Sequence, residues 1–353
     1  MVATRQPWGS TVAGVALLVL SMIGLAWAAE VPTQQEPAGE PRTIVVALDG
    51  TGEFRSIQEA IDAARNGDTI RIKAGRYSED VIVHSKERLT IIGESRDRVI
   101  VLGRDRFGAF HVGKWPYGAE QIAISGLTIK DRSGLAMGIY NGRGIVLHDV
   151  RVEGTLFGQQ VRDVRVEKCD LGGSETTGVQ FADSEAVLIG NRIHDNDHGV
   201  TASGTSRVRL ERNIITRNLF EGVVVTDRAE AVLLSNTIAK NGGGAAFLSE
   251  SRNEVTGNII GLNKVGVVIA PSSQVRVSFN ALYNTEHDYL RAGSPSVPAP
   301  ELKSDSDLII DPHFVNPAKD DFRLRADTPL VRVGGFAYLG ALEPEKDIPL
   351  SPQ

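Results

Sequence analysis

An asparagine recurs along the second half of the chain at an almost constant interval, and this repeat restricts the fold more than any other feature. The intervals between successive asparagines are 22, 23, 22 and 22 residues. A fixed period of this length is typical of a solenoid, in which each repeat forms one coil that packs on the next. The repeated residues are Asn191, Asn213, Asn236, Asn258 and Asn280.

Other columns follow the same register. When the register is continued toward the N-terminus, the first column holds Cys169, Val150 and Leu127. Two more columns lie downstream of the asparagines in each repeat. They contain Asn196, Asn218, Asn241 and Asn263, and then Gly199, Gly222, Gly244 and Gly266.

The apolar residues within each unit alternate with a period of two, as in Val208 and Leu210, which predicts short strands bounded by Asn and Gly turns. No segment between Gly93 and Asn284 has helical periodicity. We therefore predict an all-β fold, a right-handed parallel β-helix whose coils stack about 4.8 Å apart. Asn tolerates the left-handed conformation needed at a repeated bend, and its amide can bond to the Asn of the adjacent coils in a ladder.

A solenoid needs ends that cannot aggregate. At the N-terminal end, the stretch "SIQE" from Ser56 to Glu59 has the form of a capping box, which predicts a short amphipathic helix that is stopped by Gly67. At the other end a Pro-rich loop follows the repeats, and we expect the strands after it to close the stack. We expect the Asp311-Pro312-His313 triplet to be a turn before one of these strands.

The chain divides into four parts by composition. Residues 1–28 have a positive residue, an apolar run and a small-x-small cleavage site, which predict a signal peptide and a secreted or periplasmic protein. An uncleaved membrane anchor is the alternative, although the run is short for a span. The remaining parts are a disordered spacer at 29–42, a β-helix domain at 43–343 and a tail at 344–353. Within the domain we expect a cap and first coils at 43–93, regular repeats at 120–290, and a loop with a C-terminal cap at 291–343.

The composition excludes some functions. The formal net charge is -6, so we expect no nucleic-acid partner. Cys169 is the only cysteine, which rules out an intrachain disulfide. Its place in the asparagine column predicts a buried thiol. We also expect a monomer with no membrane span after signal cleavage.

The stretch "NRIHDNDHG" at 191–199 is unusually rich in His and Asp. Its asparagines and glycine belong to the repeated columns, so only His194, Asp195, Asp197 and His198 need explanation. Arg217 occupies the position of Asp195 in the next coil, which favours a stacked ion pair over a metal ligand. The His and Asp spacings match no recognised metal site, and we predict none.

Two segments carry a family resemblance. The N-terminal one, "IVVALDGTGEFRSIQEAIDAARNGDTIRIKAGRYSEDVIV", resembles pectin methylesterases and the wider pectate-lyase-like β-helix superfamily. The C-terminal one, "DPHFVNPAKDDFRLRADTPLVRVGGFAYLGALE", resembles that of bacterial secreted right-handed β-helix repeat proteins. The resemblance implies the β-helix fold, and it is less specific for activity.

An esterase of this kind would need two Asp, each seven residues after the repeat position of its coil. Phe157 and Thr176 occupy those positions here, and no "GRPW"-like motif supplies the Arg. The nearby Gln159 and Gln160 do not replace the carboxylates. We therefore expect no methylesterase chemistry by that mechanism.

A mixed-charge stripe on the central coils is the candidate site. Lyases of the superfamily use an Arg or Lys base, with cations or Ca²⁺ to balance charge. The candidate catalytic residues are Lys168, Asp170, Arg192 and Arg212, and the candidate substrate-binding residues are His148, Arg151, Arg165, Glu167, Arg209 and Glu211. The alternative is that stacked charges only neutralise one another, as in Asp149–Lys168 and Arg151–Asp170–Arg192.

Two classes of function remain open. One is an exported protein that binds or processes an acidic polysaccharide along the stripe. The other is a non-enzymatic periplasmic or surface scaffold. The absent esterase aspartates favour the scaffold, and the clustered charge favours the polysaccharide. We expect a polysaccharide partner and no cofactor, with Ca²⁺ left open.

Overall fold

The computed structural model describes residues 40–345 except 105–107, 115 and 294. The predicted signal peptide, most of the predicted spacer and most of the tail lie outside the described residues. Among those described, no helix is both long and apolar enough to cross a membrane.

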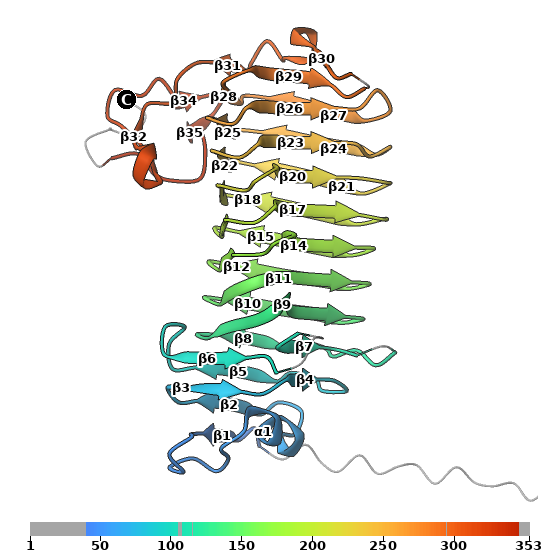
Figure 1. The fold of residues 1–353 in the computed structure, drawn as a ribbon, viewed down its shortest axis with the longest axis vertical. Helices are drawn as coiled ribbons and strands as arrows, with labels where there is room; N and C mark the ends of the chain where they lie inside the picture. The colour runs from blue at the N-terminus through green and yellow to red at the C-terminus, as the bar shows by residue number, and fades with distance from the viewer. Residues whose placement is uncertain (1–39, 105–107, 115, 294, 346–353) are drawn as a thin grey trace, which may run out of the picture. The chain divides into compact units, whose positions relative to one another are not determined.

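Three strand segments per coil build the domain, and each row of strands pairs in parallel along the stack (Figure 1). The first row is a sheet of eleven strands. It contains β1 (Thr43–Val46), β2 (Thr69–Ile72), β5 (Thr90–Gly93), β8 (Ala123–Ser125), β10 (Arg143–His148), β12 (Arg162–Glu167), β15 (Glu185–Ile189), β18 (Arg207–Glu211), β21 (Glu230–Leu234), β24 (Arg252–Thr256) and β27 (Gln274–Ser278).

The second row follows the bend that contains the repeated asparagines. It contains β3 (Gly75–Ser78), β6 (Val99–Leu102), β9 (Thr128–Tyr140), β11 (Arg151–Gln159), β13 (Asp170–Gly172), β16 (Arg192–His194), β19 (Ile214–Thr216), β22 (Thr237–Ala239), β25 (Ile259–Gly261), β28 (Ala281–Tyr283) and β31 (Leu308–Ile309).

The third row completes each coil, and the long strands β9 and β11 belong to both of the last two rows. Its other members are β4 (Val81–Val83), β7 (Phe110–Val112), β14 (Thr177–Ala182), β17 (His198–Ser203), β20 (Glu221–Val225), β23 (Gly243–Phe247), β26 (Val265–Ile269) and β29 (His287–Arg291).

Alternate residues of each strand point inward and form one apolar core along the stack. In one coil Leu188, Ile193 and Val200 come from the three rows, and all are 0% exposed. The predicted all-β, parallel β-helix fold is confirmed.

The bend before the second row has a different origin from the one predicted. The residue before each asparagine, and not the asparagine, adopts the left-handed conformation, as at Arg212 (φ 52°) and Ser235 (φ 52°). The asparagine is there for its hydrogen bonds. In Asn213, Oδ1 accepts from the backbone N–H of Asn191 at 2.9 Å, and Nδ2 donates to the carbonyl of Leu188 at 2.9 Å and to Oδ1 of Asn236 at 3.0 Å.

This pattern repeats from Asn191 to Asn280, where Asp307 accepts the last bonds in place of a further asparagine. A second ladder joins Asn196, Asn218, Asn241 and Asn263. Because each amide satisfies buried backbone groups of its neighbour, the asparagine recurs in every coil from Asn191 to Asn280.

The N-terminal cap is helix α1 (Ile57–Ala63), and Ser56 is its N-cap as predicted. The Ser56 hydroxyl accepts from the N–H of Glu59 at 3.3 Å. The predicted capping box assigned the second carboxylate to Glu59, and this was wrong. The carboxylate at the helix start is that of Glu79, which accepts from the N–H of Ile57 at 2.9 Å and from the Ser56 hydroxyl at 2.6 Å. The helix also ends at Ala63, before the predicted stop at Gly67.

The C-terminal end differs from the expected closure of the stack. The segment with β30 (Val297–Pro298) and helix η1 (Pro300–Leu302) covers the last coil, where Leu302 packs against the core. The chain then returns along the side of the coils. This part comprises β32 (Phe314–Asn316), η2 (Pro317–Lys319), β33 (Asp321–Leu324), β34 (Val331–Val333) and β35 (Phe336–Tyr338).

Figure 1 shows this returning segment beside β22, β25 and β28. Its residues Phe314, Phe322 and Leu339 form a second apolar cluster with Ile259 and Ala281 of the second row. Only residues near 300 therefore cap the stack, and residues 311–345 cover a side face instead.

Candidate functional site

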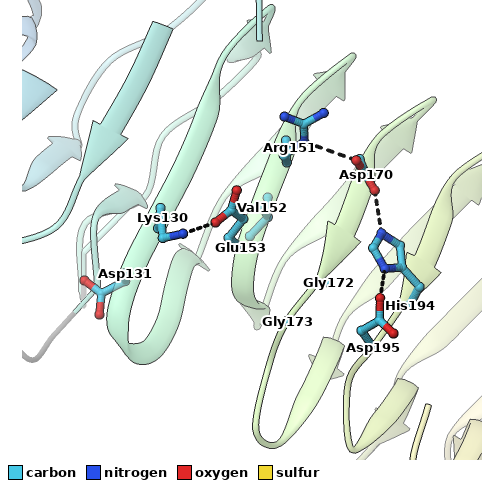
Figure 2. Close-up of a pocket in the computed structure, with 10 residues that line it drawn as sticks. All are labelled: Lys130, Asp131, Arg151, Val152, Glu153, Asp170, Gly172, Gly173, His194 and Asp195. Atoms are coloured by element: carbon cyan, nitrogen blue, oxygen red, sulfur yellow. Dashed lines mark hydrogen bonds and ion pairs between the residues drawn. The ribbon is translucent and has the colours of Figure 1, made fainter. Parts of the chain in front are cut away.

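A charged groove of about 500 Å³ lies on the second row, across four neighbouring coils (Figure 2). Each of β9, β11, β13 and β16 contributes outward residues to it. The lining residues are Lys130, Asp131, Arg151, Val152, Glu153, Asp170, Gly172, Gly173, His194 and Asp195. Gly172 leaves room for His194 in the groove, because a Cβ on Gly172 would come within 2.5 Å of the His194 carbonyl oxygen and 3.0 Å of its ring.

His194 lies between two carboxylates in this groove. Its Nε2 is 2.7 Å from Oδ1 of Asp170, and its Nδ1 is 2.7 Å from Oδ2 of Asp195. An ionised carboxylate only accepts hydrogen bonds, so both ring nitrogens must carry a proton. The hydrogen bond to Asp170, and then that to Asp195, raise the pKa of His194 above its ordinary value of 6.5. The imidazolium is therefore the form that the groove favours.

The two carboxyl groups shift in the opposite direction. The hydrogen bond from His194, followed by that from Arg151, lowers the pKa of Asp170 from 3.8 to about 2. The hydrogen bond from Arg217, followed by that from His194, lowers the pKa of Asp195 to about 2. Both groups are therefore ionised at neutral pH.

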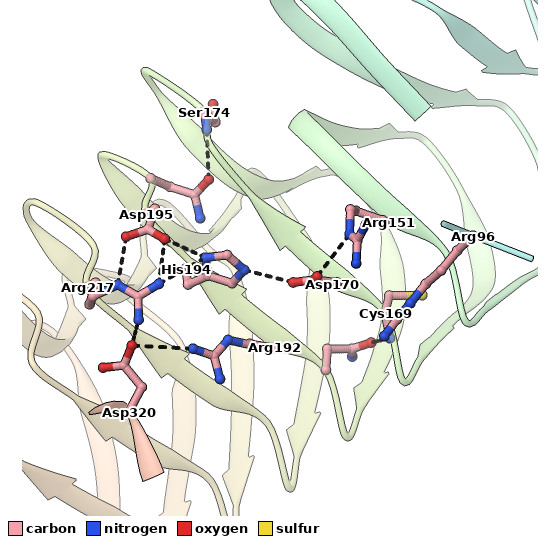
Figure 3. A network of polar contacts seen from close by, with 12 residues as sticks. Arg96, Arg151, Cys169, Asp170, Ser174, Arg192, His194, Asp195, Arg217 and Asp320 are labelled. Atoms are coloured by element: carbon pink, nitrogen blue, oxygen red, sulfur yellow. Dashed lines mark hydrogen bonds and ion pairs between the residues drawn. The ribbon is translucent and has the colours of Figure 1, made fainter. Parts of the chain in front are cut away.

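The ion pairs continue beyond the groove to the returning C-terminal segment (Figure 3). Arg217 donates Nε and Nη2 to the two oxygens of Asp195, at 2.8 and 2.6 Å, and its Nη1 contacts Asp320. Asp320, in the turn between η2 and β33, also accepts from Nζ of Lys240 at 2.8 Å and from Nη2 of Arg192 at 3.5 Å. One carboxylate thus joins three successive coils to the C-terminal segment.

The other end of the groove is joined to a loop after β5. Arg151 donates Nη1 to Asp97 at 3.0 Å and Nε to Asp170 at 3.1 Å. Lys130 and Glu153, which are register partners on the adjacent strands β9 and β11, form a close ion pair. The groove is thus bounded by Asp97 at one end and reaches toward Asp320 at the other.

The structure divides the predicted charged stripe. His148, Arg165, Glu167, Arg209 and Glu211 lie on β10, β12 and β18 of the first row, on the other side of the bend from the groove. There they pair locally: Arg209 Nη2 is 3.1 Å from Glu211, His148 Nδ1 is 3.6 Å from Glu167, and Arg165 contacts Glu167. These candidates form a separate surface from the groove.

The four candidate catalytic residues are also separated. Asp170 lines the groove. Arg192, its neighbour in register on β16, turns instead to Asp320. Lys168 and Arg212 lie exposed at the bend and do not line the groove.

The predicted ion pairs were correct in part. Arg151–Asp170 and Asp195–Arg217 are present. The pairs Asp170–Arg192 and Asp149–Lys168 are wrong, because Asp170 bonds to His194 and Asp149 lies 3.2 Å from Arg96. Register places Asp170 beside Arg192, but His194, two residues later on the same strand, bonds to the carboxylate at 2.7 Å, and Arg192 bonds to Asp320.

Sequence reasoning missed Lys130, Glu153 and Asp320, and did not place His194 in the site. Lys130 and Glu153 precede the asparagine repeats, so the strongest periodic signal does not extend to them. The coil register could still have indicated them. Arg151 pairs with Thr128, and two residues further along the same strands Glu153 pairs with Lys130. Asp320 is 128 residues from Arg192, and no repeat relates the two.

Of the two esterase positions, Phe157 lies on the third row, where it pairs with β14, and Thr176 lies just before β14. The ring of Phe157 meets Tyr140 edge-on with centroids 5.9 Å apart, and Tyr140 stacks on His111 at 5.8 Å. Tyr140, Gln159 and Gln160 line a smaller hollow with Asn141. Neither Phe157 nor Thr176 supplies the carboxylate that the methylesterase mechanism would need.

The described residues contain no group of three or more His, Cys, Asp or Glu that could hold a metal ion. Cys169 is buried, and burial raises the pKa of its thiol to about 12. Its Sγ donates to the carbonyl of Glu167 at 3.2 Å. It is therefore an unreactive structural thiol, as predicted.

Two family models match the chain. The right-handed β-helix region matches residues 117–282, and the pectinesterase model matches residues 43–142. With the observed fold, these matches confirm the resemblance to pectate-lyase-like β-helix proteins. No curated protein matches the sequence.

Solved structures agree with this fold. The pectate lyase Pel9A is 12% identical, with a TM-score of 0.51 over 87% of this chain and 97% of the lyase. The pectin methylesterase from carrot is 16% identical over 78% of this chain and 91% of its own, with a TM-score of 0.43. The A-module of the mannuronan C-5 epimerase AlgE4 from Azotobacter vinelandii is 13% identical over 72% and 95%, with a TM-score of 0.42. At 12% identity the likeness to Pel9A shows the fold alone.

Proposed function

We propose that this protein binds a polysaccharide in the groove on β9, β11, β13 and β16. The observation that carries the proposal is the continuous row of oriented donors and acceptors from Lys130 to Asp195 across successive coils. A chain laid across the coils would meet a new polar pair at each one. The pectate lyase with a similar fold, whose name gives pectate as its substrate, supports a polysaccharide as the ligand class.

The groove retains bonding capacity for a ligand. The bonds from Arg151 to Asp97 and Asp170 use two of the five guanidinium N–H groups. The carboxylates of Asp170 and Asp195 likewise have lone pairs beyond those bonded to His194 and the arginines. Because these side chains already hold one another in place, binding would cost little side-chain entropy.

The charge balance of the groove bears on the kind of polysaccharide. The lining has four carboxylates, at Asp131, Glu153, Asp170 and Asp195, against Lys130, Arg151 and the imidazolium of His194. This surface has no positive excess to attract a polyanion. We therefore place a hydroxyl-rich chain with few carboxylates first, and the acidic polysaccharide expected from the sequence second.

Binding without turnover fits the groove better than catalysis. Both ring nitrogens of His194 are bonded to carboxylates, and Asp170, although it keeps lone pairs, is a weak base because its pKa is lowered to about 2. A general base needs a free lone pair directed at the proton that it removes. Neither ring nitrogen of His194 offers one while both carboxylates are ionised.

We also propose that the protein is exported to the periplasm or outside the cell and acts as a monomer. The apolar run and small-residue cleavage site in residues 1–28 support export. Mass spectrometry of the protein recovered from the expressing cell would test this. A mature N-terminus near residue 29 is expected, and an intact N-terminus would contradict it.

The test is a set of binding isotherms for the purified domain with neutral glucans, mannans and xylans, and with polygalacturonate and alginate. Arg151→Gln should weaken binding about tenfold or more, as expected for loss of hydrogen bonds from a charged group. Arg207→Gln is the matched control, because Arg207 forms an ion pair with Glu230 on the first row, outside the groove.

Three outcomes would contradict the proposal. Equal losses in the two variants would place the ligand elsewhere. Release of unsaturated sugar or methanol would show an enzyme. If no polysaccharide binds, the scaffold function becomes the better explanation.

A further inference from the structure

One turn of the coil stack carries an extra residue. The turn from the second asparagine column to the third-row strand has a single residue in three neighbouring coils: Asp197, Gly242 and Lys264. Between Asn218 and the start of β20 at Glu221 it has two, Leu219 and Phe220. Before the turn, the equivalent residues Asn196 and Asn218 are 22 residues apart. After it, the paired residues Val200 and Val223 are 23 apart, so the insertion lies in this turn.

The inserted pair is apolar and exposed. Leu219 is 64% exposed and Phe220 is 49% exposed. Their backbone is nevertheless fixed, since the N–H of Leu219 donates to the Asn196 carbonyl at 2.8 Å and that of Phe220 donates to Asp197 at 2.8 Å. A rigid turn that holds two large apolar side chains in water does not serve the core.

Phe220 packs against an aromatic neighbour. Its ring packs against His198 of the preceding coil with centroids 5.1 Å apart and planes at 31°. The Glu221 carboxylate lies 3.2 Å from Nδ1 of His198, and Asp197 is adjacent in the chain. On the following coil, Gly242 and Gly243 have no side chains that could cover the ring. The surface is thus an aromatic face with carboxylates at its edge.

This surface adjoins the charged groove. Asp195 lines the last coil of the groove, and only Asn196 separates it from Asp197. Asp195 and Phe220 also lie on adjacent coils, since Arg217 bonds to Asp195 and Phe220 bonds to Asp197. A chain that leaves the groove in the direction of Asp195 would therefore meet the ring of Phe220.

We propose that Phe220 and His198 form a further subsite that stacks on the nonpolar face of an uncharged sugar ring. Glu221 and Asp197 would accept hydrogen bonds from its hydroxyl groups. This inference rests on the proposed polysaccharide-binding function and deepens it by assigning a neutral sugar unit to this position. Aromatic rings offer large rigid contact area at low entropic cost, which suits them to this use.

The test compares Phe220→Ala, Phe220→Trp and the control Leu248→Ala, which removes another exposed apolar side chain. The probes are short and long oligosaccharides of a polysaccharide that binds the unaltered protein. Phe220→Ala should weaken binding of the long oligosaccharide about two- to tenfold. It should not affect one that fills only the groove. Phe220→Trp should retain the affinity, and Leu248→Ala should not change it.

The failures of the two proposals can be told apart. If Arg151→Gln weakens binding and Phe220→Ala does not, only the subsite is overturned. If neither does, the groove is overturned as well. Sedimentation of the unaltered protein and of Phe220→Ala provides a second check. A self-associating protein that becomes monomeric on loss of Phe220 would show that the patch is a contact between copies, and would overturn the subsite.

Discussion

The second row of strands is used in two different ways along one stack. In the coils of the groove, the outward position after the asparagine column holds Arg151, Asp170 and Arg192, and the side chains form an open polar network. In later coils the same position holds Ile214, Thr237, Ile259 and Ala281. There residues 311–345 pack over them.

This contrast shows what determines the role of each coil. The inward residues are apolar in both halves, so the core does not distinguish them. The residue at the outward position distinguishes them. Where it is mostly apolar, the C-terminal segment packs over it, and where it is charged, it stays open to solvent and to a ligand. Asp320 marks the boundary, because it belongs to the cover and bonds to the last charged coils.

The largest expected effect is on the covered half. Ile259 is 1% exposed and packs in the cluster with Phe314 and Phe322. Ile259→Ala should lower the free energy of unfolding by about 2–5 kcal/mol, the usual cost of such a cavity. It should also make residues 311–345 more sensitive to protease. Ile189→Ala, on the half-buried outer face of β15, is the control and should cost less. Equal effects would show that the cover contributes no packing energy.

The asparagine ladder, which runs from the last coil of the groove through the covered half, should give the next effect. Asn213→Ala leaves the N–H of Asn191 and the carbonyl of Leu188 without their partners in a buried bend. The expected loss is about 1–3 kcal/mol in urea unfolding. Gln274→Ala removes an exposed amide and should be neutral. A neutral Asn213→Ala would refute the structural role assigned to the ladder.

The junction between the halves should contribute less. Asp320→Ala removes the carboxylate that Arg217 and Lys240 contact, and their side chains are 30% and 29% exposed. Solvent screens such pairs, so the unfolding free energy should fall by only about 1 kcal/mol. Hydrogen exchange of the turn near Asp320 should rise. An unchanged exchange rate would mean that the apolar cluster alone holds the cover.

The smallest expected effect is a pH dependence of the open half. Because the pKa of His194 is raised in the fold, its stabilising contribution is complete below pH 6.5 and is lost as the pH rises through the raised value. The contribution of Asp170 and Asp195, whose pKa values are lowered from 3.8 to about 2, is present above pH 3.8 and is lost as the pH falls toward 2.

His194→Gln tests this dependence because Gln carries no charge. The stability advantage of the unaltered protein over the variant should be larger at about pH 5 than at about pH 9. Urea midpoints at the two pH values provide the measurement. An advantage that is constant, or larger at high pH, would mean that His194 is neutral in the fold.

The periodic parts of the molecule were accessible to sequence reasoning, and the aperiodic parts were not. The asparagine column and the pairs Arg151–Asp170 and Asp195–Arg217 follow from the coil register, because stacked strands place equivalent residues side by side. The bonds of Glu79 to the first helix and of Asp320 to Arg192 join segments that no repeat relates. The register also does not determine which of two nearby side chains bonds to a given partner. His194 and Arg192 lie on the same face, and only side-chain geometry selects His194 for Asp170.

The most direct test of the account is carboxyl-group labelling, read by mass spectrometry with and without a polysaccharide that binds. The account predicts that the ligand protects Glu153, Asp170 and Asp195 in the open half. Glu185 and Glu230 on the first row should label equally in both samples. Protection of Glu185 and Glu230, or unchanged labelling of the groove carboxylates at saturation, would contradict the claim that the open half of the second row is the binding surface.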